Sequence, residues 1–306
     1  MFQKPLLARC DNRGVKAKTN PLSGEPVEWF APQALSKLDL RSLSFDFFVD
    51  WVKLVISSEI WIKRIVLPSQ SWPILDADIL YKELVSFDSA QMLADLSHIS
   101  VRYGLKARFY LFKESTDWEK SPSVILMCTL GESGKIESVE EVILLELKRK
   151  IQSLSGGPVQ LGSKGLIYGT STLECYLSKT DAAWPGDVDL LLYDAALNIR
   201  AIIEFKKHTL TSPIENQRIT NYYPRPDGRK YDRLALLRQR LGTKIPIVVI
   251  YYPTQENFRI VKIELITGVS GKLSAEKEMA YKLPNKNDNL TSLNFIKAIQ
   301  DFIDTA

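Results

Sequence analysis

Apolar and polar positions in the first 130 residues follow two different periods. Apolar residues spaced three or four apart predict a helix over 44–56, because this spacing lines one face of a helix. Apolar and basic residues alternate over 60–67, which predicts a strand. A second helix is expected to open at Asp88, with Gln91 as its capping-box partner. Two further strands are expected over 106–113 and 123–130.

Beyond residue 130, helical and strand-like segments alternate. A capping box from Ser138 to Glu141 predicts a helix that runs to Leu154, where the segment 155–158, Ser-Gly-Gly-Pro, would end it. Later apolar runs predict strands, and helical spacing predicts two more helices. We expect the strands at 165–177, 188–193, 200–206 and 245–252, and the helices at 231–241 and 293–303.

The pattern predicts an α/β protein of two domains. About the first 35 residues are rich in Pro, Gly and Asn and are expected to be irregular. Residues 1–131 are expected to form a smaller α/β domain that serves target recognition, ligand sensing or dimerisation. Residues 132–306 are expected to form a second domain, with the boundary near Glu132. No internal repeat is visible in the sequence.

Composition and charge narrow the classes of protein. The 306 residues contain no apolar run that approaches the length needed to cross a bilayer. The N-terminus lacks a signal-type apolar stretch, so we expect a cytoplasmic protein without a membrane partner. The net charge of +4 permits a nucleic-acid partner without requiring one.

Cysteine and histidine are scarce. Cys10, Cys128 and Cys175 are far apart and form no Cys-x-x-Cys pair, so we expect three neutral thiols rather than a disulfide framework or a structural zinc site. The two histidines are His98, expected to pack on a helix, and His208. A reaction at this protein would therefore depend on carboxylates and lysines.

Three segments mimic functional motifs. The segments 131–135 and 268–272 resemble phosphate-binding loops, but both have too few residues between their glycines and lack Ser or Thr after the lysine. Ordinary turns explain them better. The Glu146-x-Lys148 segment has a spacing that matters on a strand, but it lies on a predicted helix, where residues two apart point in different directions.

A predicted hairpin carries the residues with the clearest chemistry. Two apolar runs, 188–193 and 200–206, flank a short polar turn. Glu204 and Lys206 share one face of the second strand, because side chains alternate along a strand. A turn centred between residues 196 and 197 would place Asp189 opposite Glu204 and Asp187 opposite Lys206.

This arrangement suits phosphodiester hydrolysis. Two carboxylates roughly 5 Å apart at their Cβ atoms repel each other unless a cation or a proton lies between them. Mg²⁺ prefers oxygen ligands and keeps several waters, which can supply the nucleophile. Lys206 can orient the attacking water or stabilise the negative charge that develops on the phosphate. A solvated pair of strand ends remains the alternative explanation for these charges.

The pattern Pro185-Gly186-Asp187-Val188-Asp189, followed by Glu204-Phe205-Lys206, resembles the PD-(D/E)xK nuclease superfamily. That superfamily includes many restriction endonucleases and archaeal Holliday-junction resolvases. The resemblance covers roughly residues 138–252 and implies a restriction-endonuclease-like mixed sheet flanked by helices, in αβββαβ order. It implies Asp189 and Glu204 as ligands of Mg²⁺, or of Mn²⁺, and Lys206 as the catalytic lysine.

Some assignments stay open within this resemblance. Gly186 separates the proline from Asp187, so either Asp187 or Asp189 can be the aspartate of the motif, and the order Gly-acid-apolar-Asp favours Asp189. Many members of the superfamily add a glutamate from an earlier element. Glu146, near the apolar edge of its helix, and Glu174, on an expected strand, both qualify, and the sequence does not choose between them.

A basic segment follows the Glu-x-Lys strand. Tyr222, Tyr223 and Tyr231 are interleaved with the basic residues, which suits phosphate contacts with base stacking. A solvated helix face would explain the charges alone, and the resemblance is what favours DNA over RNA. The basic residues are Arg218, Arg225, Arg229, Lys230, Arg233, Arg238, Arg240 and Lys244.

The sequence thus favours a metal-dependent DNA endonuclease, in a context such as restriction, mobile elements or anti-phage defence. A homodimer is expected if two strands are cut, because paired cuts usually need two active sites. One competing class is a non-catalytic nucleic-acid-binding protein that uses the nuclease fold as a scaffold. A metal-dependent hydrolase of small molecules is another, and the basic segment argues against it.

Overall fold

A computed structural model describes residues 2–4, 8–10, 20–68, 75–120, 124–161 and 165–305. The chain divides into two compact units. Unit 1 contains Met1–Val15 and Phe45–Asp187, and unit 2 contains Lys16–Ser44 and Val188–Ala306. The expected boundary near Glu132 falls inside unit 1, in the turn of a β-hairpin. Ser123, the first residue of the strand expected over 123–130, lies outside the described residues.

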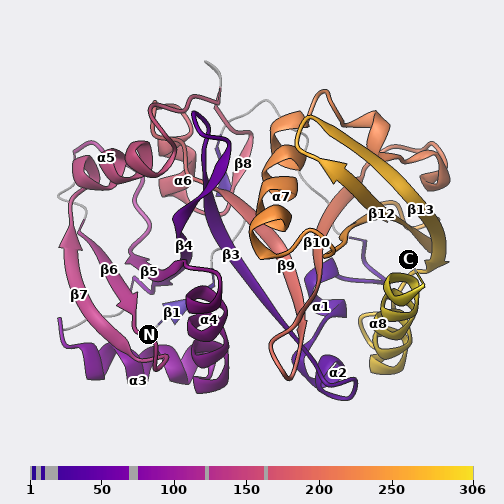
Figure 1. Ribbon diagram of the computed structural model, residues 1–306, viewed down its shortest axis with the longest axis horizontal. Helices are drawn as coiled ribbons and strands as arrows, with labels where there is room; N and C mark the ends of the chain where they lie inside the picture. Colours follow the sequence, from indigo (N-terminus) through magenta and orange to yellow (C-terminus); the bar gives the residue numbers. More distant parts are fainter. Residues whose placement is uncertain are drawn as a thin grey trace. The chain divides into compact units, whose positions relative to one another are not determined.

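Unit 1 contains a mixed sheet (Figure 1). Its strands follow the order β3-β4-β5-β6-β7, with β4 parallel to β5 and the other neighbours antiparallel. The short β1 (Phe2–Gln3) pairs with β4. The five main strands are β3 (Leu40–Asp50), β4 (Val55–Val66), β5 (Lys106–Phe112), β6 (Ile125–Leu130) and β7 (Ile136–Val142).

The helix expected over 44–56 is wrong, because these residues form β3, a turn and the start of β4. Phe45, Asp46, Phe47, Phe48 and Val49 are all buried in succession. A strand that is covered on both faces is apolar at neighbouring positions, so its alternation is lost. What remains is an apolar run whose spacing also fits a helix.

The helices of unit 1 begin at different residues from those expected. The expected Ser138 start is wrong, because 138–141 pair with β6 as part of β7. The helix α5 (Leu144–Leu154) begins later, where the Glu146 carboxylate accepts the backbone N–H of Ile143. The expected strand over 165–177 is also wrong, since it contains a two-residue β8 and a helix. The other elements are α3 (Ala77–Asp88), α4 (Ala90–Arg102), β2 (Ala8–Arg9), β8 (Tyr168–Gly169) and α6 (Thr172–Leu177).

A disulfide joins Cys10 to Cys175 in unit 1, which corrects the expectation of three neutral thiols. The two cysteines are 165 residues apart in sequence, and the pairing of β2 with β8 brings them together. Sequence spacing carries no information about such a pairing. Cys128 is a free, buried thiol as expected, and burial raises its pKa to about 12.

In unit 2, the strands of the mixed sheet follow the order β13-β12-β11-β10-β9. The strands β10 and β11 are parallel, and the helix α7 (Gly228–Leu241) connects them. The remaining neighbours are antiparallel. The strands are β9 (Gly186–Asp194), β10 (Ile199–His208), β11 (Ile247–Pro253), β12 (Ile260–Val269) and β13 (Lys272–Lys282).

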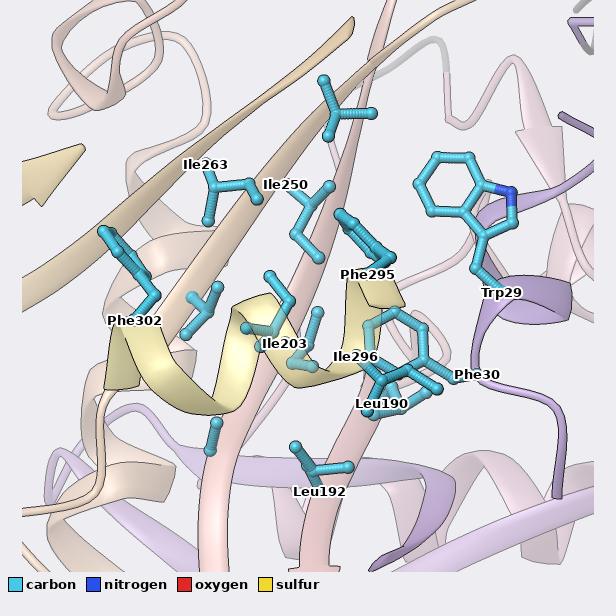
Figure 2. Packing of buried hydrophobic residues seen from close by; sticks show 14 of the residues in the cluster. Trp29, Phe30, Leu190, Leu192, Ile203, Ile250, Ile263, Phe295, Ile296 and Phe302 are labelled. Carbon is cyan, nitrogen blue, oxygen red and sulfur yellow. The ribbon is translucent and has the colours of Figure 1, made fainter. Parts of the chain in front are cut away.

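The core of unit 2 packs one face of this sheet against three helices (Figure 2). Leu190, Ile203, Ile250 and Ile263 project from four neighbouring strands into the cluster. Phe295 and Phe302 reach it from α8, and Trp29 from α1. This apolar face fixes which side chains of β9 and β10 point the other way. The helices are α1 (Pro26–Trp29), α2 (Pro32–Ser36) and α8 (Asn289–Asp304).

The two units share an order of elements that the sequence did not reveal. In each, an antiparallel strand pair leads through one or two helices to a parallel strand, then to two antiparallel strands and a helix. The α/β class with a mixed sheet flanked by helices is confirmed. The two segments that mimic phosphate loops are hairpin turns, as expected, between β6 and β7 and between β12 and β13. No helix among the described residues is long and apolar enough to span a membrane.

Candidate functional site

The hairpin of β9 and β10 has the predicted register. Leu190 pairs with Ile203 and Leu191 with Ile202, and a bulge near the turn absorbs one residue of β10. Continuing these pairs by one residue brings Asp189 opposite Glu204. Leu190 and Ile203 lie in the apolar core, so Asp189 and Glu204 project from the opposite face of the sheet.

Asp189 is held in place by the backbone. Its Oδ2 accepts a hydrogen bond of 2.6 Å from the N–H of Phe205, which lies on the neighbouring strand. The Ser44 hydroxyl donates to the Asp189 carbonyl oxygen at 2.5 Å. The Phe205 ring packs on the other face, against the ring of Phe30. The carboxylate of Asp189 is therefore oriented across the hairpin, toward the strand that carries Glu204.

Glu204 is a fully buried carboxylate, with 0% of its side chain exposed. A buried charge is costly unless an opposite charge compensates it. The cation is Lys230, in the first turn of α7, whose Nζ forms an ion pair with Glu204 Oε1. Lys230 itself is 31% exposed. The charge pair thus has one fully buried member on a strand and one partly exposed member on a helix.

Lys206 is held two residues further along the same face. Its ammonium forms an ion pair with Asp227, which immediately precedes α7. The ammonium also lies 4.2 Å from the ring centre of Tyr222, and that ring stacks on Tyr251. The Lys206 side chain is 21% exposed. The start of α7 therefore supplies the partners of both Glu204 and Lys206.

A hydrogen-bonded network supports this ring stack. The Tyr251 hydroxyl donates to Glu264 at 2.8 Å, and the same carboxylate oxygen accepts the N–H of Ile219 at 2.7 Å. Sequence analysis missed the roles of Asp227, Lys230, Tyr222 and Glu264. Asp227 and Lys230 flank the start of a helix that follows the Glu-x-Lys strand, which was the one available clue. Glu264 lies on β12, which was not predicted.

Tyr231 points to space for a further polar group. Its side chain is 1% exposed, and its hydroxyl has no hydrogen-bond partner among the residues that the structure describes. Burial raises the pKa of this hydroxyl, and the Glu204 carboxylate raises it further. A buried polar atom without a partner costs about 1–3 kcal/mol, so a water or ligand atom is expected beside it. This orphan hydroxyl near Glu204 fits a hydrated cation.

The donor set for a metal ion is small. Within the described ranges, no group of three or more His, Cys, Asp or Glu side chains is arranged to hold a metal. Asp189 and Glu204 supply two carboxylates from neighbouring strands. Mg²⁺ is often bound through one or two carboxylates, with water and phosphate oxygens completing its shell. The residues present fit such an ion, provided that Lys230 leaves Glu204.

The alternative acids all belong to unit 1. Glu174 lies on α6, not on a strand, and its carboxylate is 3.3 Å from the ammonium of Lys63. Asp187 is exposed and raises the pKa of both Lys63 and Asp46 electrostatically. Glu146 caps the start of α5. Each of these acids thus has a described role within its own unit.

The basic segment is less available to a ligand than its sequence suggests. Arg238 is buried and donates to the carbonyl oxygens of Ile266 and Gly268, and Lys230 pairs with Glu204. Tyr223 and Tyr231 are buried, so the expected base stacking on them is wrong. Their ring faces complete the helix–sheet packing instead. The exposed basic residues are Arg218, Arg225, Arg229, Arg240 and Lys244.

No family model and no curated protein matches this chain. Solved structures with weak similarity include a sex pheromone precursor from Lactobacillus salivarius subsp. salivarius. It shares 11% identity at a TM-score of 0.19, over 80% of this chain and 68% of the other. The sex pheromone staph-cAM373 precursor shares 9% identity at a TM-score of 0.19, over 84% and 89%. Similarities at this level carry no argument about fold or function.

Proposed function

We propose that this protein is a metal-dependent nuclease with its active site on β9 and β10 of unit 2. One observation carries the proposal. Asp189, Glu204 and Lys206 come from neighbouring strands and project from one face of the sheet, and the last two pair with residues at the start of α7. A fully buried glutamate next to a partly exposed lysine is costly for a structural role, and active sites are where such arrangements concentrate.

Each residue of the site would have its own role in the reaction. Asp189 and Glu204 would hold Mg²⁺ or Mn²⁺, and such an ion supplies a bound water as nucleophile and neutralises charge on a phosphate. The Asp189 carboxylate is oriented by the N–H of Phe205, so little reorganisation is needed. Lys206 would leave Asp227 and donate to a phosphate oxygen in the transition state.

A polyanionic substrate is supported by the exposed arginines near this site. Arg225 and Arg229 lie on either side of Asp227, and Arg218 lies in the preceding turn. Phosphate contacts from such residues contribute most of the non-specific affinity for nucleic acid. The choice of DNA over RNA follows the resemblance of the Asp189 and Glu204-x-Lys206 pattern to nucleases, as does the expectation of a homodimer for double-strand cuts.

Plasmid cleavage tests the proposal. Purified protein would be incubated with supercoiled plasmid in Mg²⁺, in Mn²⁺ and in EDTA, beside the Lys206→Ala variant. We expect nicked or linear product with the metal ions, and none with EDTA or the variant. Lys148→Ala is the matched control, because Lys148 has the same Glu-x-Lys spacing on the surface-lying helix α5. Cleavage that survives both EDTA and Lys206→Ala would refute the assignment.

A non-catalytic nucleic-acid-binding protein is the second candidate. The observation that favours it is the pairing of both Glu204 and Lys206 with charged residues at the start of α7. If these pairs are permanent, no catalytic group is available. This alternative predicts DNA binding in a gel-shift assay that Arg225→Ala and Arg229→Ala weaken, without cleavage in any metal.

A further inference from the structure

We propose that Lys230 is a built-in cation for Glu204 that a divalent metal ion displaces. The inference rests on the proposed metal site. It adds that the metal-free protein keeps the site folded by placing an ammonium where the metal would otherwise supply the positive charge. Lys230 would then control how tightly the metal binds, without being a ligand itself.

The burial of Glu204 makes a compensating cation necessary. The carboxylate lies inside the sheet–helix layer with no exposed side-chain surface. Burial raises the pKa of the Tyr231 and Tyr252 hydroxyls, and the nearby Glu204 carboxylate adds to both shifts. Taking a charge into such surroundings costs several kcal/mol when nothing of opposite sign accompanies it. A fold that keeps Glu204 ionised here must therefore supply a positive charge in every state.

Lys230 is suited to leave this position. Its side chain is 31% exposed, and it belongs to the first turn of α7. A lysine is a flexible, strongly hydrated point charge, so it can turn into solvent without a change of the backbone. Arg238, by contrast, is buried on the same helix and donates hydrogen bonds to two backbone carbonyls of β12. The helix is therefore anchored at its end while its first turn carries the exchangeable charge.

Two exchanges are expected to accompany metal binding. A divalent ion at Asp189 and Glu204 carries twice the charge of Lys230 and repels it. The released ammonium remains beside Asp227, which precedes it by three residues and now pairs with Lys206. Lys230 can then form the ion pair with Asp227 in place of Lys206, which would leave Lys206 available to the substrate. The start of α7 would thus convert metal binding into the release of the catalytic lysine.

Direct metal binding tests this competition. Mn²⁺ affinity would be measured by titration calorimetry for the wild type and for Lys230→Met, with Arg229→Met as a control that removes a neighbouring exposed charge. We expect Lys230→Met to bind Mn²⁺ on the order of tenfold more tightly, in the usual range of coupling between competing ligands. The control should bind about equally or only slightly more tightly, because it removes an exposed positive charge that solvent already screens. Equal or weaker binding by Lys230→Met than by the control would overturn the proposal.

The wild type gives an independent readout in case Lys230→Met folds poorly. Lysine acylation followed by mass spectrometry reports how exposed each ammonium is. Lys230 should react severalfold faster with Mn²⁺ than with EDTA, while the exposed Lys244 should react equally in both. A Lys230 rate that does not change when Mn²⁺ binds would overturn the inference. If Mn²⁺ binds neither protein and plasmid stays intact, the proposed function fails as well, whereas plasmid cleavage with unchanged labelling refutes the inference alone.

Discussion

Each unit of the molecule places a lysine on the second strand of an antiparallel pair, β4 or β10, but the two lysines differ in what holds them. In unit 1, Lys63 is 7% exposed, and its ammonium lies 3.3 Å from both Asp46 and Glu174. It also donates to the Thr170 hydroxyl at 2.7 Å. In unit 2, Lys206 is 21% exposed and pairs with Asp227. The first lysine is enclosed by partners from separate elements, and the second is partly exposed and pairs with a partly exposed aspartate.

The two units share an order of elements, but the two lysines do not occupy equivalent positions in it. They project from different faces of their strands. Lys206 projects toward α7, the helix that connects the two parallel strands of unit 2. Lys63 projects toward α6, whereas the neighbouring Arg64 projects toward the connecting helices of unit 1 and pairs with Asp88. Residue types on neighbouring strands therefore do not define a site. A structural ion cluster differs from a reactive one in the number of partners that hold the lysine and in how readily those partners can separate from it.

Replacing each lysine should give opposite results, and this is the largest effect we expect. Lys206→Met should lower plasmid cleavage by about a hundredfold to a thousandfold, because a positioned charge acts on the transition state. Its stability should change by less than about 1 kcal/mol, as for other partly exposed pairs. Lys63→Met should lower the free energy of unfolding by about 3–5 kcal/mol, because it leaves buried carboxylates without their cation.

Urea denaturation and plasmid cleavage, measured on both variants, check this pair of results. Lys120→Met is the control for loss of a positive charge, since Lys120 is exposed and pairs only within its own turn with Asp117. The comparison of the two units would be wrong if Lys63→Met were as stable as the control, or if Lys206→Met cleaved plasmid at the wild-type rate.

The local part of this picture could be predicted from the sequence. The β9–β10 register followed from two apolar runs and a short polar turn, because pairing is local there. The helix α7 followed from its apolar spacing. The partners of Glu204 and Lys206 could not be predicted, since contacts between a strand and the helix after it depend on how the helix packs. The role of Glu264 could not be predicted either, because this residue lies 60 residues from Glu204 in sequence.

Long-range burial defeated the remaining predictions. The residues 44–56 suggested a helix because burial on both faces of β3 hides its alternation. Ser138 and Glu141 looked like a capping box, yet both lie on β7, where pairing with β6 makes the segment a strand. The disulfide between Cys10 and Cys175 depends on a pairing of two short strands that no local pattern announces.

The ion cluster of Lys63, Asp46 and Glu174 in unit 1 should also affect how the stability of the protein depends on pH. Burial raises the pKa of Asp46 from 3.8 to about 6, although Lys63 opposes this shift. Between these two pH values the unfolded chain loses the Asp46 proton before the folded protein does. The contribution of Asp46 is therefore full below about pH 4 and falls by roughly 3 kcal/mol as the pH rises through 6.

Asp46→Asn should remove this fall while keeping an acceptor for the Trp184 indole N–H. The measurement is urea denaturation of wild type and variant from pH 4 to 8, with the difference plotted against pH. Asp50→Asn provides a control whose difference should stay nearly flat over this range. Hydrogen bonds from Lys53 and Val52 hold the pKa of Asp50 below its usual value of 3.8, so its contribution is lost only as the pH falls below that value. A wild-type minus Asp46→Asn difference that is flat from pH 4 to 6 would contradict the assignment.

The smallest expected effect concerns the aromatic rings under the two lysines. The Lys206 ammonium lies 4.2 Å from the centre of Tyr222, and the Lys63 ammonium 4.9 Å from the centre of Trp184. A cation over an exposed ring gains about 0.5–1 kcal/mol, which corresponds to a rate change of a few fold. Tyr222→Leu should therefore reduce plasmid cleavage a few fold with little change in stability, and Tyr222→Phe, which keeps the ring, should restore it. Trp184→Phe should leave cleavage unchanged and lower stability by about 1–3 kcal/mol, because Asp46 loses a buried hydrogen-bond donor. Cleavage that falls equally in Tyr222→Leu and Tyr222→Phe would show that the hydroxyl bonded to Gln217, rather than the ring, positions Lys206.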